Sequence, residues 1–335
     1  MEIKKNTSLK SFNTFGIDVM ATSFVEVQNI EEVKSVLSNN KQPLLILGGG
    51  SNLLFTTDFE GLVIKNNLKG ITVVEENDSE IYLRIGAGEV WHEFVLYSIE
   101  NGYAGIENLS LIPGNVGASP MQNIGAYGVE VKDVITEVEA LHLKDYSLNT
   151  FSNEACEFGY RSSVFKTSEK GNYFITAVTF KLNKQAKVNT SYGAIDSELK
   201  RLEIENPTIK DVSRAVINIR SSKLPDPKKI GNSGSFFKNP VISEAQKNKI
   251  LINYPDAPNY SQPNGDFKMA AGWLIEKCGW KGRRIDNYGV HELQALVLVN
   301  YGGAKGSDVY SLSEQIIESV NSKFGIILER EVNIL

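Results

Sequence analysis

The hydrophobic pattern at the start of the chain predicts a small β-α-β unit. Asn29 can cap a helix over about Ile30–Asn39, and Glu32, three residues after it, completes a capping box. Short apolar runs on both sides have the length and composition of buried strands. These strands are predicted at residues 24–28, 44–47 and 62–65, and the second runs directly into a glycine-rich turn at residues 48–52.

The middle of the chain alternates between apolar and polar positions in several segments, which is the pattern of half-buried strands. A single stretch, residues 90–100, has helical spacing instead. Residues 112–128 form a long loop rich in Gly, Pro and Asn, and a loop of this length inside a compact domain is usually functional or disordered. The strands are predicted at residues 71–75, 81–85, 135–143 and 173–182.

The C-terminal part begins after a helix whose apolar face is formed by Ile209, Val212, Ala215, Val216 and Ile219. The sequence Leu-Pro-Asp-Pro at residues 224–227 then breaks the chain and opens a third region. Helices are predicted near residues 243–252 and 267–278 and around residues 309–320, with strands at residues 293–299 and 326–334. The mixture of elements predicts an α+β fold in about three regions, with no internal repeat.

Composition narrows the function classes. The net charge of -5 and the absence of a long basic run argue against a nucleic-acid-binding face. The N-terminus lacks the apolar stretch of a secretory signal, and the longest apolar runs are too short to span a bilayer, so we expect a cytoplasmic protein. Cys156 and Cys278 are expected to be reduced thiols, and with only 3 histidines a zinc site is not expected.

Three segments carry candidate chemistry. Glycines at residues 48–52 would let backbone N–H groups approach a pyrophosphate, although a simple tight turn explains them too. The loop at residues 112–128 could wrap a flat ligand and offer many backbone donors, and its apolar residues argue against free solvation. Ser235, in the turn of residues 231–240, is either a catalytic hydroxyl or a turn residue. The Rossmann and Walker glycine patterns are both absent.

The order of these segments resembles the UDP-N-acetylenolpyruvoylglucosamine reductases. The resemblance runs from about Leu9 to the C-terminus and depends on IPG-x-VGASPMQNIGAYG and GSFFKNP occurring in register. Further matching segments are residues 48–52, 159–165, 223–227, 270–278 and 328–332. Ser191-Tyr192-Gly193 is similar to the tyrosine loop of the longer type of this family.

The resemblance implies a vanillyl-alcohol-oxidase-type FAD-binding fold, divided into residues 1–68 and 69–214, followed by a substrate-binding domain at residues 215–325. Residues 326–335 would form a C-terminal strand that returns to the FAD-binding region. Because some relatives of this fold attach flavin through a histidine and neither glycine loop contains one, FAD is expected to be non-covalent. The implied cofactor-binding residues are Gly48, Gly49, Gly50, Ser51, Asn52, Pro113, Gly114, Gly117, Ala118, Ser119, Gln122, Asn123, Gly125, Ala126, Tyr127 and Arg220.

The resemblance also implies the reaction, which is NADPH-dependent reduction of UDP-N-acetylglucosamine enolpyruvate to UDP-N-acetylmuramate, a peptidoglycan precursor. Ser235 matches the proton donor, with Glu331 and Arg161 as its companions. Glu331 is chosen over Glu329 because it directly precedes a valine. Substrate-lining positions are Tyr192, Lys223, Asn239 and Gln294, and those around the uridine diphosphate are Tyr260, Lys268 and Lys281.

Other functions stay open at this point. An oxidase of the same fold would share the flavin loops but would not need Ser235. A serine hydrolase built on Ser235 would need a histidine base, and only His92, His142 and His291 are available. A non-enzymatic nucleotide-binding module would bind FAD without turnover. We expect the protein to be a monomer that binds neither nucleic acid nor membranes.

Overall fold

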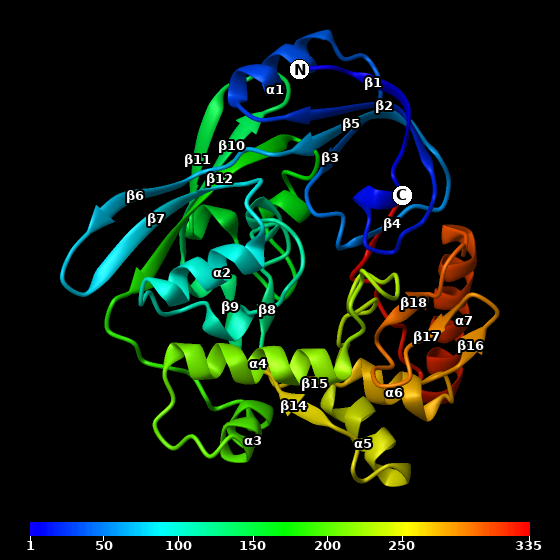
Figure 1. The fold of residues 1–335 in the computed structure, drawn as a ribbon. Helices are drawn as coiled ribbons and strands as arrows, with labels where there is room; N and C mark the ends of the chain where they lie inside the picture. Colours follow the sequence, from blue (N-terminus) through cyan, green and yellow to red (C-terminus); the bar gives the residue numbers. More distant parts are fainter. The chain divides into compact units, whose positions relative to one another are not determined.

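The β-α-β pattern at the N-terminus forms a four-stranded sheet in the computed structural model, which describes residues 1–335. The chain divides into two compact units. The first is made of Met1–Thr7, Ala21–Gly49 and Glu60–Ser222. The second is made of Ser8–Met20, Gly50–Phe59 and Lys223–Leu335. The four-stranded sheet of the first unit has the order β1-β2-β5-β3, in which β3 and β5 are parallel (Figure 1). Its elements are β1 (Lys4–Ser8), β2 (Met20–Val27), α1 (Ile30–Asn39), β3 (Leu44–Leu47) and β5 (Phe59–Asn66).

The predicted start of α1 is confirmed, with one difference in the cap. The Asn29 side chain accepts the backbone N–H of Glu32 at 2.9 Å, which satisfies one free donor of the first helical turn. The Glu32 carboxylate reaches past the cap and accepts the N–H of Gln28 at 2.7 Å. The capping box is therefore displaced by one residue. Val33, Val36 and Leu37 of α1 are buried against the sheet.

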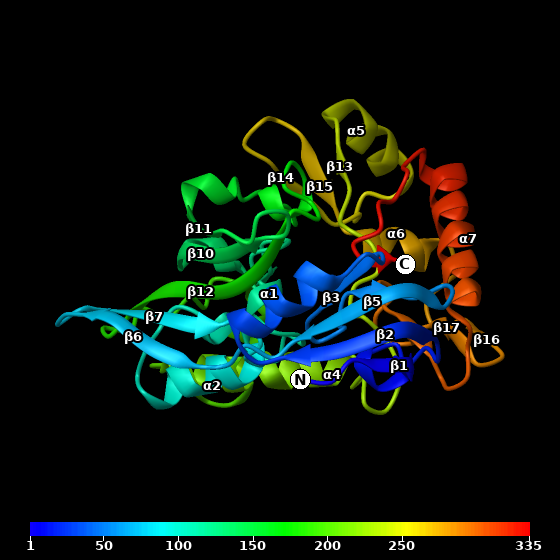
Figure 2. The ribbon, with the colours of Figure 1, turned by 90° about the horizontal axis from the view of Figure 1, so that it is seen from above.

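A second sheet in the first unit is antiparallel throughout and has the order β11-β10-β12-β7-β6. Helix α2 (Trp91–Glu100) packs on it through an aromatic cluster in which the Trp91 and Phe180 rings lie 5.9 Å apart. β6 and β7 extend as a long hairpin at the sheet edge (Figure 2). The strands are β6 (Ile71–Glu76), β7 (Glu80–Gly86), β10 (Ile135–His142), β11 (Leu148–Ser152) and β12 (Tyr173–Asn183), and a small hairpin joins β8 (Gly125–Ala126) to β9 (Val129–Glu130).

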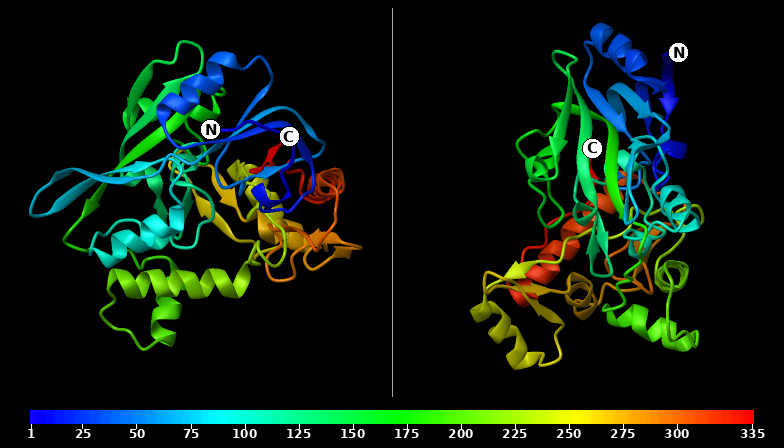
Figure 3. Two further views of the ribbon diagram at one scale, coloured as in Figure 1. Left: turned by 45° about the horizontal axis from the view of Figure 1, so that its top comes forward. Right: turned by 90° about the vertical axis from the view of Figure 1, so that its left-hand side faces the viewer.

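Two helices complete the first unit. α3 (Gly193–Arg201) packs against α4 (Ile209–Lys223), as Figure 3 shows. The residues predicted to form the apolar face of α4 are all buried, and they meet Ile195 and Leu199 of α3. The resemblance placed a helix after Ser191-Tyr192-Gly193, and α3 is that helix, although its apolar pattern is weak because only these two of its 9 residues are buried.

The second unit consists of small sheets and three helices. Its sheets have the orders β13-β15-β14, β16-β17-β18 and β19-β4, and α7 packs against β17, β18 and α6. The strands are β4 (Leu53–Leu54), β13 (Val241–Ile242), β14 (Asn259–Ser261), β15 (Phe267–Met269), β16 (Arg284–Ile285), β17 (Tyr288–Val290), β18 (Leu298–Asn300) and β19 (Asn333–Ile334). The helices are α5 (Glu244–Asn253), α6 (Ala271–Lys277) and α7 (Gly306–Phe324).

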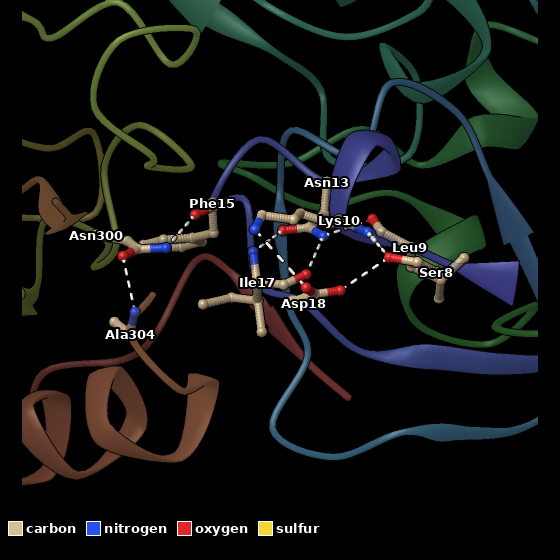
Figure 4. Close-up of polar contacts among 9 residues, drawn as sticks. All are labelled: Ser8, Leu9, Lys10, Asn13, Phe15, Ile17, Asp18, Asn300 and Ala304. Atoms are coloured by element: carbon tan, nitrogen blue, oxygen red, sulfur yellow. Dashed lines mark hydrogen bonds and ion pairs between the residues drawn. The ribbon is translucent and has the colours of Figure 1, made fainter. Parts of the chain in front are cut away.

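Two buried amides organise the segment Ser8–Met20: Asn13 closes it internally, and Asn300 joins it to the rest of the second unit (Figure 4). The Asn13 amide donates to the carbonyls of Leu9 and Ile17 at 2.7 and 2.9 Å, and its oxygen accepts the Ile17 N–H at 3.0 Å. The Asn300 amide donates to the Phe15 carbonyl at 2.8 Å. The two side chains therefore form hydrogen bonds with loop backbone groups that no helix or strand satisfies.

Three predicted elements in the second unit differ from the structure. Residues 267–278 are not one helix, because Phe267–Met269 pairs as β15 and the Asn239 side chain caps α6 only at Ala271. The strand at residues 293–299 is shorter, since the N–H of His291 donates to Val297 and closes a local loop before β18. The strand at residues 326–334 is reduced to Asn333–Ile334, which pairs in parallel with β4. No helix combines the length and apolarity needed to cross a membrane.

Trp91 offers a test of how α2 is held. Its indole N–H donates to the buried Leu109 carbonyl at 2.9 Å, and its side chain is only 1% exposed. We expect Trp91→Phe to lower the free energy of unfolding by about 1–3 kcal/mol, because the carbonyl loses its donor. Val74→Thr, at a position 59% exposed in β6, is the control and should change it by less than about 0.5 kcal/mol. Urea denaturation followed by circular dichroism measures both, and equal effects would contradict the assignment.

Candidate active site

The glycine turn after β3 meets the long loop through direct backbone contact. A Cβ atom on Gly49 would lie 2.7 Å from the Gly114 Cα, a distance that side-chain carbons do not adopt. A Cβ on Gly48 would meet only the Asn115 side chain at 3.7 Å, an ordinary contact. Position 49 therefore has to be glycine because two segments of the first unit touch there. A tight turn alone would not impose this requirement.

Lys65 supports this turn and was not found by the sequence analysis. Its ammonium donates to the Gly48 carbonyl at 2.5 Å, from the neighbouring strand β5. Burial lowers the pKa of Lys65, which the nearby Glu26 partly offsets. The available signal was a lysine directly after the apolar run Leu62–Ile64, a position where a charge needs a partner.

The remainder of the turn belongs to the second unit. Gly50 has φ of +65°, and a Cβ there would lie 2.0 Å from the Phe12 carbonyl oxygen. Asn52 donates through its amide to the backbone carbonyl of Glu331 at 3.3 Å, and its own carbonyl accepts the N–H of Asn333 at 3.1 Å. Ser51 is half-buried between them. The turn thus contacts the segment that carries a predicted catalytic glutamate.

The loop at residues 112–128 is partly buried, in line with the expectation that its apolar residues argue against free solvation. Val116 is fully buried, and a Cβ on Gly117 would lie 2.5 Å from that of Ala87. The Gly114 carbonyl accepts the N–H of Trp91 at 3.0 Å. Met121 departs from the expectation, since it is 38% exposed. Pro113 and Ala118 also lie at the surface, whereas Gly114, Gln122, Gly125 and Ala126 are half-buried.

Ser119 carries an unsatisfied polar group in this loop. Its side-chain oxygen is buried without a hydrogen-bond partner in the chain, although Ser119 as a whole is 1% exposed. An unsatisfied buried hydroxyl is costly, so such groups usually mark a place where a ligand or a water binds. Together with the glycine contacts, this hydroxyl fits a loop that holds a polar cofactor.

Asn123 and Arg161 fix the second half of the loop. The fully buried Asn123 amide donates to the Gly159 carbonyl at 3.0 Å, and its oxygen accepts the N–H of Lys132 at 3.1 Å. Arg161 has φ of +52°, and its guanidinium donates to the Gly125 carbonyl at 2.7 Å. The structure therefore brings the predicted catalytic arginine to the predicted flavin loop.

Tyr127, Tyr192 and Arg220 form a second cluster in the first unit. The Tyr127 and Tyr192 rings are perpendicular, with centroids 5.3 Å apart. Burial raises the pKa of the Tyr127 hydroxyl, and a hydrogen bond from Arg220 opposes the shift. Tyr192 is 47% exposed. A predicted cofactor residue and a predicted substrate residue therefore touch at the loop end.

In the second unit, Ser235 and Glu331 lie on adjacent extended segments. Ser235 bridges to Val297, and the next residue, Phe236, accepts the N–H of Glu331 through its carbonyl at 2.8 Å. Gly234, with φ of +67°, provides the turn before Ser235. Glu329 lies at the surface in an ion pair with Lys238, whereas Glu331 is half-buried. The choice of Glu331 as the catalytic glutamate stays a prediction.

The predicted substrate residues are distributed over both units. Tyr260 and Lys268 are direct cross-strand partners in the β14–β15 hairpin, and Tyr260 is 59% exposed. Lys281 is instead paired with Glu276 at 3.1 Å. The Asn239 and Gln294 side-chain oxygens accept backbone N–H groups of Ala271 and Leu296 at 2.9 and 3.3 Å, and Lys223 is exposed at the end of α4.

The histidines give no support to a serine hydrolase. His291 is in the same unit as Ser235, but its Nδ1 accepts the N–H of Leu293 at 3.4 Å. His142 pairs with Asp145 at 2.9 Å, and His92 accepts a backbone N–H in the first unit. Without a histidine bonded to the serine, the triad arrangement is missing.

Comparison with known proteins identifies the class and then the family. The FAD binding domain family matches residues 21–145, and the family described as UDP-N-acetylenolpyruvoylglucosamine reductase, C-terminal domain, matches residues 226–335. A crystal structure of UDP-N-acetylenolpyruvylglucosamine reductase from Thermus caldophilus covers 100% of this chain and 99% of its own, with a TM-score of 0.69 and 23% identity, and thus shares the fold. The chain is therefore a two-part protein with an FAD-binding domain.

Curated relatives named UDP-N-acetylenolpyruvoylglucosamine reductase match over the whole length. The relative from Flavobacterium johnsoniae is 49% identical, with 100% of both chains covered, and so is that from Amoebophilus asiaticus. The one from Pseudomonas aeruginosa is 46% identical, with 100% of this chain and 99% of the relative covered. The chain belongs to the UDP-N-acetylenolpyruvoylglucosamine reductase family, as the sequence resemblance indicated.

The contact between the two glycine segments can be tested without cofactor. We expect Gly49→Ala to destabilise the flavin-free protein by about 1–3 kcal/mol, because the new methyl group overlaps the Gly114 backbone. Gly48→Ala is the matched control, since its methyl group would make only an ordinary contact. Differential scanning calorimetry of the two variants provides the comparison, and a Gly49→Ala melting temperature equal to that of Gly48→Ala would show that the segments do not meet as described.

Proposed function

We propose that this chain catalyses the NADPH-dependent reduction of UDP-N-acetylglucosamine enolpyruvate to UDP-N-acetylmuramate through bound FAD. The observation that carries the proposal is the full-length match to reductases of this name, at 49% identity. It is supported by the neighbouring positions of Ser235 and Glu331 in the second unit. The reaction class is that of an oxidoreductase acting on a CH–CH bond, and its place is in the synthesis of peptidoglycan precursors.

FAD would be held by the glycine turn and the long loop. The backbone N–H groups near Gly48 and Gly49 suit a pyrophosphate, and the free Ser119 hydroxyl gives the loop a polar contact. Bound there, FAD would supply the hydride-transfer chemistry between NADPH and the vinyl carbon of the substrate. We propose that the flavin is non-covalent, because neither segment contains a histidine that could attach it. The remaining cofactor-binding residues are those that the family resemblance gives.

The catalytic residues act on the charge that develops in the substrate. Once the vinyl carbon has gained a hydride, negative charge builds on the carbon that bears the ether oxygen and spreads onto the carboxylate. Arg161 can bind that carboxylate, and a protonated Glu331 can donate a hydrogen bond to it. Ser235 then gives its hydroxyl proton to the carbon. A hydroxyl is a weak acid, but a carbon-centred anion is a strong base, so the transfer is reasonable.

The substrate residues suit a sugar nucleotide. The paired side chains of Tyr260 and Lys268 combine an aromatic ring with a cation, which fits a uridine diphosphate. Lys281 would have to exchange its ion pair with Glu276 for a phosphate. Tyr192, Lys223, Asn239 and Gln294 are proposed to line the remainder of the substrate site.

The proposal extends to the organisation and surroundings of the enzyme. We propose flavin-binding subdomains at residues 1–68 and 69–214, a substrate-binding domain at residues 215–325 and a returning strand at residues 326–335. The enzyme would be a cytoplasmic monomer without nucleic-acid or membrane partners. Its product feeds cell-wall biogenesis, on which cell shape and cell division depend.

Flavin content and turnover test the function. The purified protein should be yellow, and acid precipitation should release all of its flavin into solution. The colour should bleach with NADPH and return when the enolpyruvyl sugar nucleotide is added without oxygen. An oxidase of the same fold would recover its colour with oxygen alone, and a binding module would not bleach. Flavin that stays with the acid pellet would contradict non-covalent binding.

Ser235→Ala separates the two half-reactions. Flavin binding and its reduction by NADPH should persist, because neither needs a proton from this serine. Reoxidation by the enolpyruvyl substrate should slow by roughly 10²–10⁴-fold, the usual effect of losing a general acid. Ser235→Cys, the matched control, should keep more activity because a thiol can still donate a proton. Stopped-flow absorbance measures each half-reaction, and near wild-type reoxidation of Ser235→Ala would show that the role is wrong.

A further inference from the structure

Leu111, the residue before the long loop, has a strained backbone that two helices hold in place. Its φ of +59° is in the left-handed region, which branched residues rarely adopt. Its N–H donates to the Nδ1 atom of His92 at 3.0 Å, and its carbonyl accepts the Nε of Arg220 at 3.3 Å. His92 lies in α2 and Arg220 in α4, so each helix binds one polar group of the same residue.

Arg220 is the residue of this group that we expect to contact the cofactor. Burial lowers the pKa of its guanidinium. Tyr127 opposes this shift through its charge and through a hydrogen bond, and no carboxylate contributes. A buried cation without an acidic partner is unfavourable unless an anion binds beside it. The Tyr127 side chain, which Arg220 contacts, lies at the end of the proposed flavin loop. An anionic part of the cofactor is therefore the expected partner of Arg220.

We propose that His92 is a positioning residue for FAD, in which the neutral imidazole accepts the Leu111 N–H and so directs the Leu111 carbonyl to Arg220. The inference rests on the proposed flavin site. It requires Nδ1 to be unprotonated, with the ring proton on Nε2. A protonated imidazole has no acceptor and would repel both the Leu111 N–H and the guanidinium.

The electrostatic surroundings agree with a neutral imidazole. Burial lowers the pKa of His92, Arg220 lowers it further, and Glu93 on the same helix opposes them. Because the folded pKa lies below the ordinary value of about 6.5, the arrangement is intact above that pH and is lost as the pH falls through the folded pKa. FAD affinity should therefore decrease in acid by way of this residue.

Three replacements of His92 test the acceptor role. His92→Asn places an oxygen near the Nδ1 position, His92→Gln places it near Nε2, and His92→Leu offers no acceptor. The dissociation constant for FAD is measured by titrating the apoprotein and following flavin fluorescence. It should rise by about tenfold or more in His92→Leu and His92→Gln and stay close to the wild-type value in His92→Asn. The Asn variant should also lose the acid dependence. His142→Asn, at a half-buried histidine of the same unit that bonds Asp145, should leave the FAD affinity unchanged.

Coupling to Arg220 separates positioning from general packing. In an Arg220→Met background, His92→Leu should cause little further loss of FAD affinity, since the residue that it positions is absent. Additive losses, or equal losses for Leu, Gln and Asn, would overturn the inference, as would wild-type affinity in His92→Leu. If the wild-type apoprotein itself failed to bind FAD, the proposed function would be wrong instead.

Discussion

The backbone contact between Gly49 and Gly114 is the constraint on which the first unit depends. Two segments that are distant in sequence approach so closely that no side-chain carbon fits between them. One segment follows from β3, whose partner strand β5 contributes Lys65 to the Gly48 carbonyl. The other is fixed to α2 by the hydrogen bond between Trp91 and Gly114. Both sheets of the unit therefore contribute to the position of a single pair of glycines.

The polar groups around this contact are arranged as if for an anionic, flat partner. Lys65 and Arg220 are cations in partly buried places, and Ser119 carries a buried hydroxyl with no partner. Each of these features is unfavourable in an isolated chain. Lys65 and Arg220 have neutral oxygen partners in the Gly48 and Leu111 carbonyls, and a phosphate-containing cofactor would add the negative charge that these partners lack, which agrees with the FAD binding domain match.

Sequence patterns predicted those elements whose burial is regular. α1 and β3 were predicted with the bounds that the structure gives, because their apolar positions follow helical or strand spacing. The short strands of the second unit were missed or lengthened, since elements such as β15 and β19 are defined by pairing with distant residues. The glycine loops and Ser235 were proposed from their motifs, and Lys65 could have been noticed as a charge beside an apolar run. The bonds to Leu111 could not be predicted, because they depend on which helices become neighbours.

The second unit has a consequence for the order of events during synthesis. Asn300 holds the Phe15 carbonyl across 285 positions of sequence, and the Leu335 carbonyl accepts the N–H of Thr56 at 2.7 Å. A ribosome that adds roughly 5–20 residues per second exposes the Phe15 segment for about 15–60 s before Asn300 exists. Phe15 and Ile17, which are almost fully buried in the finished protein, lack their final C-terminal partners for that time. Residues 223–335 expressed alone would lack the segments Ser8–Met20 and Gly50–Phe59, which complete the second unit.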